Sequence, residues 1–568
     1  MPSVDSEDWK SAADAKREAF KKQVDSYAYA LPKVDSSTLD VSTISLDGVM
    51  DPKHVQITNM EVGELVEKLQ KGELKAVEVT KAFCHRAAIA HSLVNCLTEV
   101  YFDRAIKHAE ELDEKFKEGG PVGPLHGFPI SLKNQICVEG VESNMGYVGW
   151  IGRVPKKNSV LADCLVRSGA VLYCQTNIPQ NLMSTECINA IYGRTVNGFN
   201  RNLSCGGSSG GEGALVGLRG SLLGFGSDIG GSIRVPSSFN GLYGLHGGAD
   251  NSCQGLEAVS SVLGPLTTSV EGLQIVTKAV LAAEPWRKDP FVHYQPWRES
   301  VYQLEAHGGG KEKLCFAFAY SNGLVKPNPP YYRAMDMTRK ALEAQGHKVI
   351  DWSFPEPEKC FDILSRVYGA DSGEDIETEC GRSGEPRMYG LCPPENPPRI
   401  SVYQYWQLCY ERRLFMATQI EAWEATESQT GTGRPVDAVI MPTSPYPSFR
   451  HDDQQDVSYT VRLVLSSDLP KFPLTALLVR SQGVCNLNDW PTAVFPVTRV
   501  DPSVDKQQPA HTFHSDYPFD KINYERYDPE VFKNAPIGLQ CIMRRGEDEA
   551  VIRVVEMVDA ALKAQKKA

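Results

Sequence analysis

The sequence predicts a single large α/β domain in which a mixed, mostly parallel twisted sheet lies between helices. Three observations favour this class. Segments typical of strand, turn and helix alternate along the chain, 42% of its 568 residues are apolar, and it contains no internal repeats. That much apolar material can bury a large core, and large α/β enzymes often form one compact unit at this length.

The first part of the chain combines helices with one buried strand. Residues 5–24 are expected to form a helix because apolar side chains recur roughly on one stripe. A longer helical block is expected over 61–117, with a break at Gly72. The apolar run 127–133 then predicts a short buried strand that ends in a lysine.

The middle of the chain predicts repeated strand–turn–helix units. A helix over 159–169 is followed by a strand over 171–175. A second helix, 210–218, and a strand, 222–227, come next, and another helix is expected to begin at Gly230. Alternation of this kind implies a parallel or mixed sheet that helices cover.

The remainder contains a long insertion and a return to the sheet. Residues 285–460 are rich in proline, glycine and charged residues, so we interpret them as an excursion over the core that lines a substrate pocket. Strands are expected at 437–442 and 536–542, and an amphipathic helix at 547–562. The predicted division is an N-terminal arm (1–60), the main domain (61–555), and a C-terminal helix end with a basic tail (556–568).

Charge and composition exclude several classes of protein. A formal net charge of −12 argues against nucleic acid or an anionic membrane as the main partner. No stretch approaches the ~20 apolar residues of a membrane-spanning helix, and the acidic N-terminus does not resemble a signal peptide. The fifteen cysteines are scattered and never spaced Cys-x-x-Cys, which favours reduced thiols and a cytoplasmic location.

The glycine-rich segment 205–248 carries the most informative chemistry. It contains two Gly-Gly-Ser turns whose serines, Ser208 and Ser232, stand 24 residues apart with a helix and a strand expected between them. Glycine runs allow backbone N–H groups to crowd around a small anion. The second turn is well suited to an oxyanion at a helix start, with donors from four consecutive residues: Ile229, Gly230, Gly231 and Ser232.

Other interpretations of this segment have weaker support. Residues 206–210 match the Gly-x-Ser-x-Gly elbow formally, but the preceding residues are too polar for the strand that an elbow requires. The Gly-Lys-Ser/Thr ending of a phosphate-binding loop is missing, and the dinucleotide fingerprint fits poorly. Histidine is the usual base beside a serine, and His246 is the nearest one, but we expect it to hydrogen-bond locally.

Lys133 is the alternative base. It ends an apolar strand, where a charge is costly unless it is paired or neutralised. Lowering a lysine pKa from about 10.4 to about 7.5 requires on the order of 4 kcal/mol of burial and nearby dipoles. Position alone favours a lysine that extends to solvent from a strand end. The two serine turns favour the base.

Several segments together resemble the amidase signature family of serine hydrolases. The block 205–244, the run 127–133 and the segment 175–180 carry the most diagnostic likeness, which extends over most of the chain. Residues 121–133 and Pro285-Trp286 are most similar to fungal-type acetamidases, and the central block is also similar to fatty-acid amide hydrolases. The resemblance implies the amidase-signature fold.

The same resemblance implies a Ser–Ser–Lys triad. Its nucleophile falls on Ser232, its bridging serine, held in a cis peptide bond, on Ser208, and its base on Lys133. Supporting roles, structural as much as catalytic, are implied for Ser209, Asp228 and Arg234. No metal or cofactor is implied, and a homodimer is a mild expectation.

The sequence departs from the family pattern outside the triad. Asn134 follows the lysine where an acidic residue is common, which favours a neutral amine. His246-Gly-Gly-Ala249 replaces a Lys/Arg-Pro-Ser/Thr run, the loop up to Gly264 looks shorter, and Gly198 replaces a proline. These departures affect the expected pocket rim rather than the triad.

We therefore predict an amidase that hydrolyses a small-molecule carboxylic amide to an acid plus ammonia or amine through an acyl-enzyme. Two alternatives stay open. One is an amidotransferase subunit of the same family, which requires a partner chain and glutamine. The other is a relative that has lost catalysis and binds a metabolite, which the altered segment 246–260 motivates. The sequence does not identify the amide.

Overall fold

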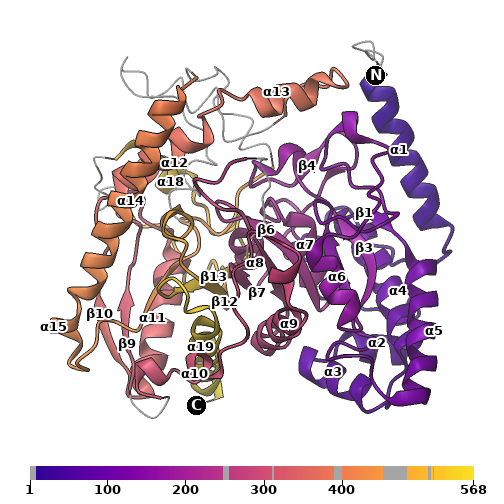
Figure 1. Cartoon of the computed structure of the whole chain (residues 1–568), viewed down its shortest axis with the longest axis horizontal. Helices are drawn as coiled ribbons and strands as arrows, with labels where there is room; N and C mark the ends of the chain where they lie inside the picture. Colours follow the sequence, from indigo (N-terminus) through magenta and orange to yellow (C-terminus); the bar gives the residue numbers. More distant parts are fainter. Residues whose placement is uncertain are drawn as a thin grey trace.

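The computed structural model describes residues 8–246, 255–309, 313–388, 399–451, 483–509, 513, 515 and 517–567. Within these residues one sheet has eleven strands, in the order β1-β3-β2-β6-β8-β7-β12-β13-β11-β9-β10. Figure 1 shows β1 and β10 on opposite sides of the molecule. The strands are β1 (Leu97–Val100), β2 (Pro129–Lys133), β3 (Val171–Thr176), β6 (Leu223–Asp228), β7 (Tyr243–His246), β8 (Val262–Thr267), β9 (Cys315–Phe318), β10 (Lys348–Asp351), β11 (Ala438–Pro442), β12 (Thr492–Arg499) and β13 (Pro536–Ile542).

The predicted mixed sheet is confirmed, but parallel pairs do not predominate. Among the described strands, six of the ten pairings are antiparallel. Four of these six pairings involve β8 or β12, which the sequence pattern did not identify, and the other two are β1 with β3 and β11 with β13. Strand β8 lies antiparallel between β6 and β7, and β12 lies antiparallel between β7 and β13. The parallel trio β3-β2-β6, which carries the lysine, matches the expectation.

The N-terminal helices differ from the prediction in one respect. The helix expected over 5–24 is α1 (Asp8–Asp25). The block expected over 61–117 is divided into α3 (Val62–Gln70), α4 (Ala76–Val94) and α5 (Phe102–Gly119), with strand β1 between the last two. All four residues of β1 are buried, and Leu97, Glu99 and Val100 pair with β3, so tertiary pairing overrides the helical pattern there.

The remaining helices cover the sheet, and some belong to the insertion. The predicted excursion 285–460 also supplies β9, β10 and β11 to the sheet. The helices are α2 (Pro52–Thr58), α6 (Val160–Arg167), α7 (Gly210–Gly217), α8 (Arg234–Phe239), α9 (Val270–Ala282), α10 (Glu299–Tyr302), α11 (Pro329–Ala344), α12 (Pro357–Tyr368), α13 (Glu374–Gly381), α14 (Val402–Glu424), α15 (Glu427–Thr430), α18 (Pro518–Arg526) and α19 (Asp548–Lys567). A separate hairpin pairs β4 (Ile188–Asn189) with β5 (Gly193–Arg194).

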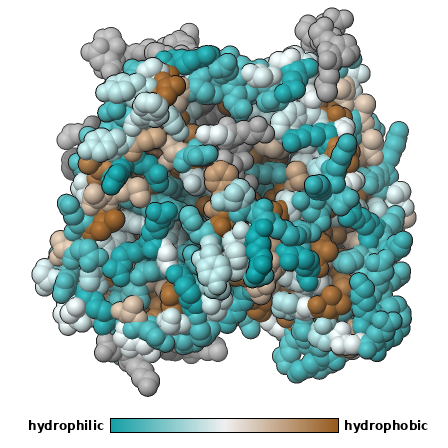
Figure 2. Space-filling model, in the orientation of Figure 1, coloured by the Kyte–Doolittle hydropathy of each residue, from teal (hydrophilic) through white to brown (hydrophobic). Residues whose placement is uncertain are grey.

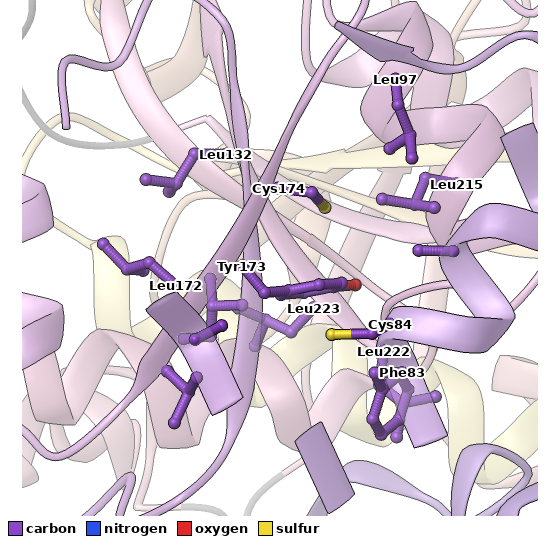
Figure 3. Close-up of a cluster of buried hydrophobic side chains, with 14 of the residues drawn as sticks. Phe83, Cys84, Leu97, Leu132, Leu172, Tyr173, Cys174, Leu215, Leu222 and Leu223 are labelled. Carbon is purple, nitrogen blue, oxygen red and sulfur yellow. The ribbon is translucent and has the colours of Figure 1, made fainter. Parts of the chain in front are cut away.

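The core around β2 and β3 determines which way the lysine faces. In Figure 3, Leu132 of β2 lies on one side of these strands, and Phe83 of α4 and Leu215 of α7 lie on the other. Because side chains alternate along a strand, Ser131 and Lys133 face the side on which α4 and α7 lie. The strand therefore directs its lysine towards the helix that follows the first serine turn.

The surface contrasts with this apolar interior. Figure 2 shows one face covered mainly by hydrophilic residues, with hydrophobic ones scattered between them. Among the described residues, no helix combines the length and apolar character required to cross a bilayer.

Candidate active site

Lys133 is completely buried at the end of β2. Its Nζ lies 2.7 Å from Ser208 Oγ and 2.7 Å from Ser227 Oγ. The Ser227 hydroxyl in turn donates to Gln135 Oε1 at 2.6 Å. The amine is therefore held between two hydroxyl groups, and because the Ser227 proton is engaged by Gln135, Ser208 is the one that can exchange a proton with it.

Ser208 lies in the first glycine turn, directly before α7. The peptide bond between Gly207 and Ser208 is cis, as the family resemblance implies. Gly206 adopts φ 81°, a left-handed conformation that favours glycine. The turn thus presents the Ser208 hydroxyl to the lysine from the side of α7.

Ser209 joins the two serine turns. Its backbone N–H donates to the Ser232 carbonyl at 3.1 Å. Its hydroxyl accepts from the Ser227 N–H at 3.2 Å and donates to the Ser227 carbonyl at 3.3 Å. Ser209 therefore fixes the second turn and the end of β6 relative to the first turn.

Among Lys133, Ser208 and Ser232, Ser232 is the most accessible to solvent. It is 9% exposed, whereas Ser208 is 1% exposed and Lys133 is 0% exposed. A nucleophile must meet substrate, and a base and a relay must be shielded from water. The gradient of burial from Lys133 through Ser208 to Ser232 has this order.

The second turn differs from its prediction in two details. The N–H of Gly231 donates to Asp228 Oδ1 at 2.7 Å, so this donor is already engaged. Helix α8 begins at Arg234 rather than at Gly230. Both differences follow from Asp228, whose other oxygen accepts from the N–H groups of Ile233 (3.1 Å) and Arg234 (3.3 Å) and holds the turn open before the helix.

Asp228 and Arg234 form a buried ion pair behind this turn. Arg234 Nε lies 3.0 Å from Asp228 Oδ2, and Nη2 lies 3.0 Å from Oδ1. Asn486 completes the cluster, because it accepts from Arg234 at 2.6 Å and donates to Asp228 at 3.1 Å. Burial alone raises the pKa of Asp228, but the guanidinium and His246 outweigh it and hold this pKa well below its usual range.

His246 lies beside the same cluster. It ends β7, and its Nδ1 lies 3.4 Å from Asp228 Oδ1. The sequence analysis expected His246 to hydrogen-bond locally, but among the described residues its Nδ1 makes no hydrogen bond, so the contact with Asp228 is one of proximity only. Most of the altered segment after it, 247–254, lies outside the described residues.

Asn134, the departure next to the lysine, braces a loop. Its Nδ2 donates to Thr98 Oγ1 at 3.1 Å, and its Oδ1 accepts from the Met145 N–H at 3.0 Å.

Sequence reasoning missed Ser227, Gln135 and Glu212. The position of Ser227 beside Asp228 was a usable signal, whereas the contacts of Gln135 and Glu212 depend on strand pairing.

A cavity of about 630 Å³ lies near the second turn, although neither the serines of the two turns nor Lys133 is among its described lining residues. Tyr368, which lines the cavity, donates its hydroxyl to the Ile229 carbonyl at 2.7 Å. Met183, another lining residue, belongs to the same apolar cluster as Ile229. The other lining residues that the structure describes are Gly255, Leu256, Val367, Ala370, Asp371, Glu374, Asp375, Ile376, Thr378, Ile400, Ser401, Val402 and Tyr405.

Known proteins are similar to this chain in architecture and in sequence. The family model described as Amidase matches residues 78–552. An acetamidase from Emericella nidulans is 38% identical over 566 residues, which cover 98% of each chain. An acetamidase from Aspergillus oryzae is 36% identical and covers 99% of this chain and 100% of its own. A solved fatty acid amide hydrolase aligns with a TM-score of 0.85 at 30% identity, over 98% of this chain and 96% of that one. The chain therefore belongs to the amidase family and is an amide hydrolase.

Proposed function

We propose that the enzyme cleaves a carboxylic amide through a Ser–Ser–Lys relay, with Ser232 as nucleophile, Ser208 as bridge and Lys133 as base. The observation that carries this proposal is the 2.7 Å contact between the buried Lys133 amine and the Ser208 hydroxyl. A neutral amine can accept the Ser208 proton across that contact. The bond from Ser209 to Ser232 supports the approach of the nucleophile to the bridge.

The proposed reaction accounts for every bond and proton without a metal or cofactor. Ser232 Oγ attacks the amide carbonyl while its proton passes to Ser208 and the Ser208 proton passes to Lys133. The C–N bond then breaks, and the proton returns through Ser208 to the leaving nitrogen. Water attacks the acyl-enzyme by the same relay and releases the carboxylic acid. The products are an acid and ammonia or an amine.

The second turn is proposed to stabilise the oxyanion. The backbone N–H groups of Ile229, Gly230 and Ser232 are the candidate donors, since Gly231 is bonded to Asp228. One such donor typically contributes ~10²–10³ in rate. The Tyr368 bond to the Ile229 carbonyl supports this role, because it fixes the peptide that leads into the turn.

The cavity beside the turn is proposed to hold the body of the substrate. Most of its described lining residues come from the predicted excursion 285–460, and several are large and apolar. The main domain 61–555, with this excursion, thus remains our proposed division. We also propose a cytoplasmic location, because the thirteen cysteines in the described part of the chain are free thiols.

The test is an amide panel that varies acyl length, read by release of ammonia or amine, together with fluorophosphonate labelling. Ser232→Ala is expected to abolish both signals, and Ser238→Ala, which removes another buried hydroxyl, is expected to retain them. Undiminished turnover in Ser232→Ala contradicts the proposal. A wild-type chain that takes no label supports the relative without catalysis, and turnover only with glutamine and a partner chain supports the amidotransferase subunit.

A further inference from the structure

Glu212 is a completely buried carboxyl group in the first turn of α7. Its Oε2 accepts from Ser131 Oγ at 2.7 Å, and its Oε1 accepts from Thr176 Oγ1 at 2.9 Å. Ser131 stands two residues before Lys133 on β2, and Thr176 is the residue of β3 paired with Lys133. The carboxyl group therefore connects α7 to both strands at the level of the lysine.

The other end of this connection is the bridging serine. Glu212 follows Ser208 by four residues, and the Gly213 N–H closes the first helical turn on the Ser209 carbonyl at 3.0 Å. Displacing the Glu212 side chain thus moves the turn that carries Ser208 relative to the strand that carries Lys133. The 2.7 Å Lys133–Ser208 contact lies between these two anchored elements.

The geometry points to Glu212 as a positioning residue that sets the Lys133–Ser208 contact by clasping α7 to β2 and β3 as an uncharged carboxylic acid. This role deepens the relay proposed above and rests on it. The clasp acts through Ser131 and Thr176 and does not touch the reacting atoms.

The glycine opposite the carboxyl group leaves the space that the Glu212 side chain occupies. Gly224 of β6 pairs with Ser131, and a Cβ atom at Gly224 would lie 1.9 Å from Glu212 Oε2 and 2.4 Å from Ser131 Oγ. This strand position therefore accommodates the clasp only when it has no side chain.

The protonation state follows from burial. Burial raises the pKa of Glu212 to about 8, although bonds from Ser131 and Thr176 and the charge of Lys133 act in the opposite direction. A protonated carboxyl group requires an acceptor. In the uncharged form the 2.9 Å contact with Thr176 runs in the opposite direction, so that the carboxyl group donates to Thr176 Oγ1 and the Thr176 hydroxyl donates to the Leu132 carbonyl, 3.5 Å away.

The groups around Glu212 are consistent with an uncharged clasp. Among the described residues, the titratable side chains that interact with it besides Lys133 are Cys96, Tyr101, Tyr173 and Cys174. Burial raises the pKa of each well above its usual value, so all four are uncharged near neutral pH. Lys133 is thus the neighbour whose charge a carboxylate at 212 would affect.

The test is the rate at which a fluorophosphonate labels Ser232, measured from pH 5 to 10 in variants of the whole chain. Glu212→Leu is expected to label about 10²-fold more slowly, because displacements of about 1 Å have that effect on reacting groups. Glu212→Gln preserves the hydrogen bonds and is expected to rescue most of the rate, with the pH of half-maximal labelling unchanged. A charged carboxylate would instead make Glu212→Gln shift that pH downward by about one unit.

Further variants keep the outcome decisive. Thr176→Val removes one hydroxyl at constant shape and is expected to slow labelling less than Glu212→Leu does. Glu549→Leu removes an equally buried carboxylate from α19 and is expected to lower the melting temperature but label at the wild-type rate.

Three results overturn the clasp: wild-type labelling rates in both Glu212→Leu and Thr176→Val, a Glu212→Gln variant as slow as Glu212→Leu, or a shifted pH midpoint in Glu212→Gln. If wild-type Ser232 itself takes no label, the proposed relay fails, and the clasp fails with it.

Discussion

Lys133 and Arg234 are both fully buried basic residues beside a serine turn, but they have different partners. Lys133 donates to the hydroxyls of Ser208 and Ser227. Arg234 makes two 3.0 Å contacts with the Asp228 carboxylate. A hydroxyl can pass a proton to an amine, whereas a guanidinium keeps its charge and binds a carboxylate in a fixed geometry. The difference separates a site that can perform chemistry from one that maintains structure.

The largest effect is expected at the lysine. Lys133→Met keeps the apolar stem and removes the base, so amide turnover and labelling of Ser232 should fall by about 10⁴-fold. The melting temperature should change little, because the variant leaves no buried charge behind. Product release and thermal unfolding check both statements. Retained activity contradicts the role of Lys133 as base, and unfolding contradicts the expected small change in melting temperature.

The arginine site is expected to show the opposite pattern. Asp228→Asn leaves the Arg234 charge buried and unneutralised, and the free energy of unfolding should fall by about 5 kcal/mol. The double variant Asp228→Leu/Arg234→Met removes both charges and should recover much of that loss. Urea denaturation measures both. Equal stability of wild type and Asp228→Asn contradicts a structural role for the pair.

Glu212 is a carboxyl group that lies near Lys133, whereas the carboxyl group of Asp228 lies beside Arg234. Its pKa is raised to about 8 in the folded protein, so its contribution to stability is fully present below the unfolded value and is lost as pH rises through 8. Between pH 5 and 8, wild type should therefore lose roughly 4 kcal/mol relative to Glu212→Gln. Denaturation curves across this range measure the difference. A constant difference indicates a carboxylate that is already ionised at pH 5.

His307 provides a second cation held by carboxylates, far from the serine turns in sequence. Its Nδ1 lies 2.8 Å from Asp437 Oδ1, and its Nε2 lies 3.3 Å from Glu547 Oε1. Burial lowers its pKa, but the two acidic partners outweigh burial and raise it to about 9. This contribution to stability is fully present below pH 6.5 and is lost as pH rises through 9, a change of about 3 kcal/mol. His307→Gln should flatten the dependence of the unfolding free energy on pH over that range. An unchanged slope would mean that other groups cause this pH dependence.

The sequence indicated candidate site residues but not the contacts that these residues make. The serine turns and Lys133 were recognisable because glycine runs and a charge after an apolar strand are local patterns, whereas the supporting roles of Asp228 and Arg234 were implied only by the family resemblance. The engagement of Gly231 by Asp228 was not predictable, since it depends on how β6 meets the turn.

Strands β1, β8, β9, β10 and β12 of the large sheet were missed for a related reason. Their burial and pairing come from the eleven-stranded sheet of the described residues, and a short segment does not reveal its neighbours. The same limit hid Glu212, whose two hydroxyl partners lie on different strands. Local patterns thus indicate candidate reactive side chains, and the sheet determines which of them meet.

The most direct measurement of the central claim is the pH dependence of fluorophosphonate labelling at Ser232 in the wild-type chain and in Lys133→Met. A neutral buried amine predicts that wild-type labelling reaches its plateau near neutral pH and that the variant loses this rise. A rate that keeps climbing towards the ordinary lysine range near about pH 10.4, or a rise that survives in Lys133→Met, contradicts the account.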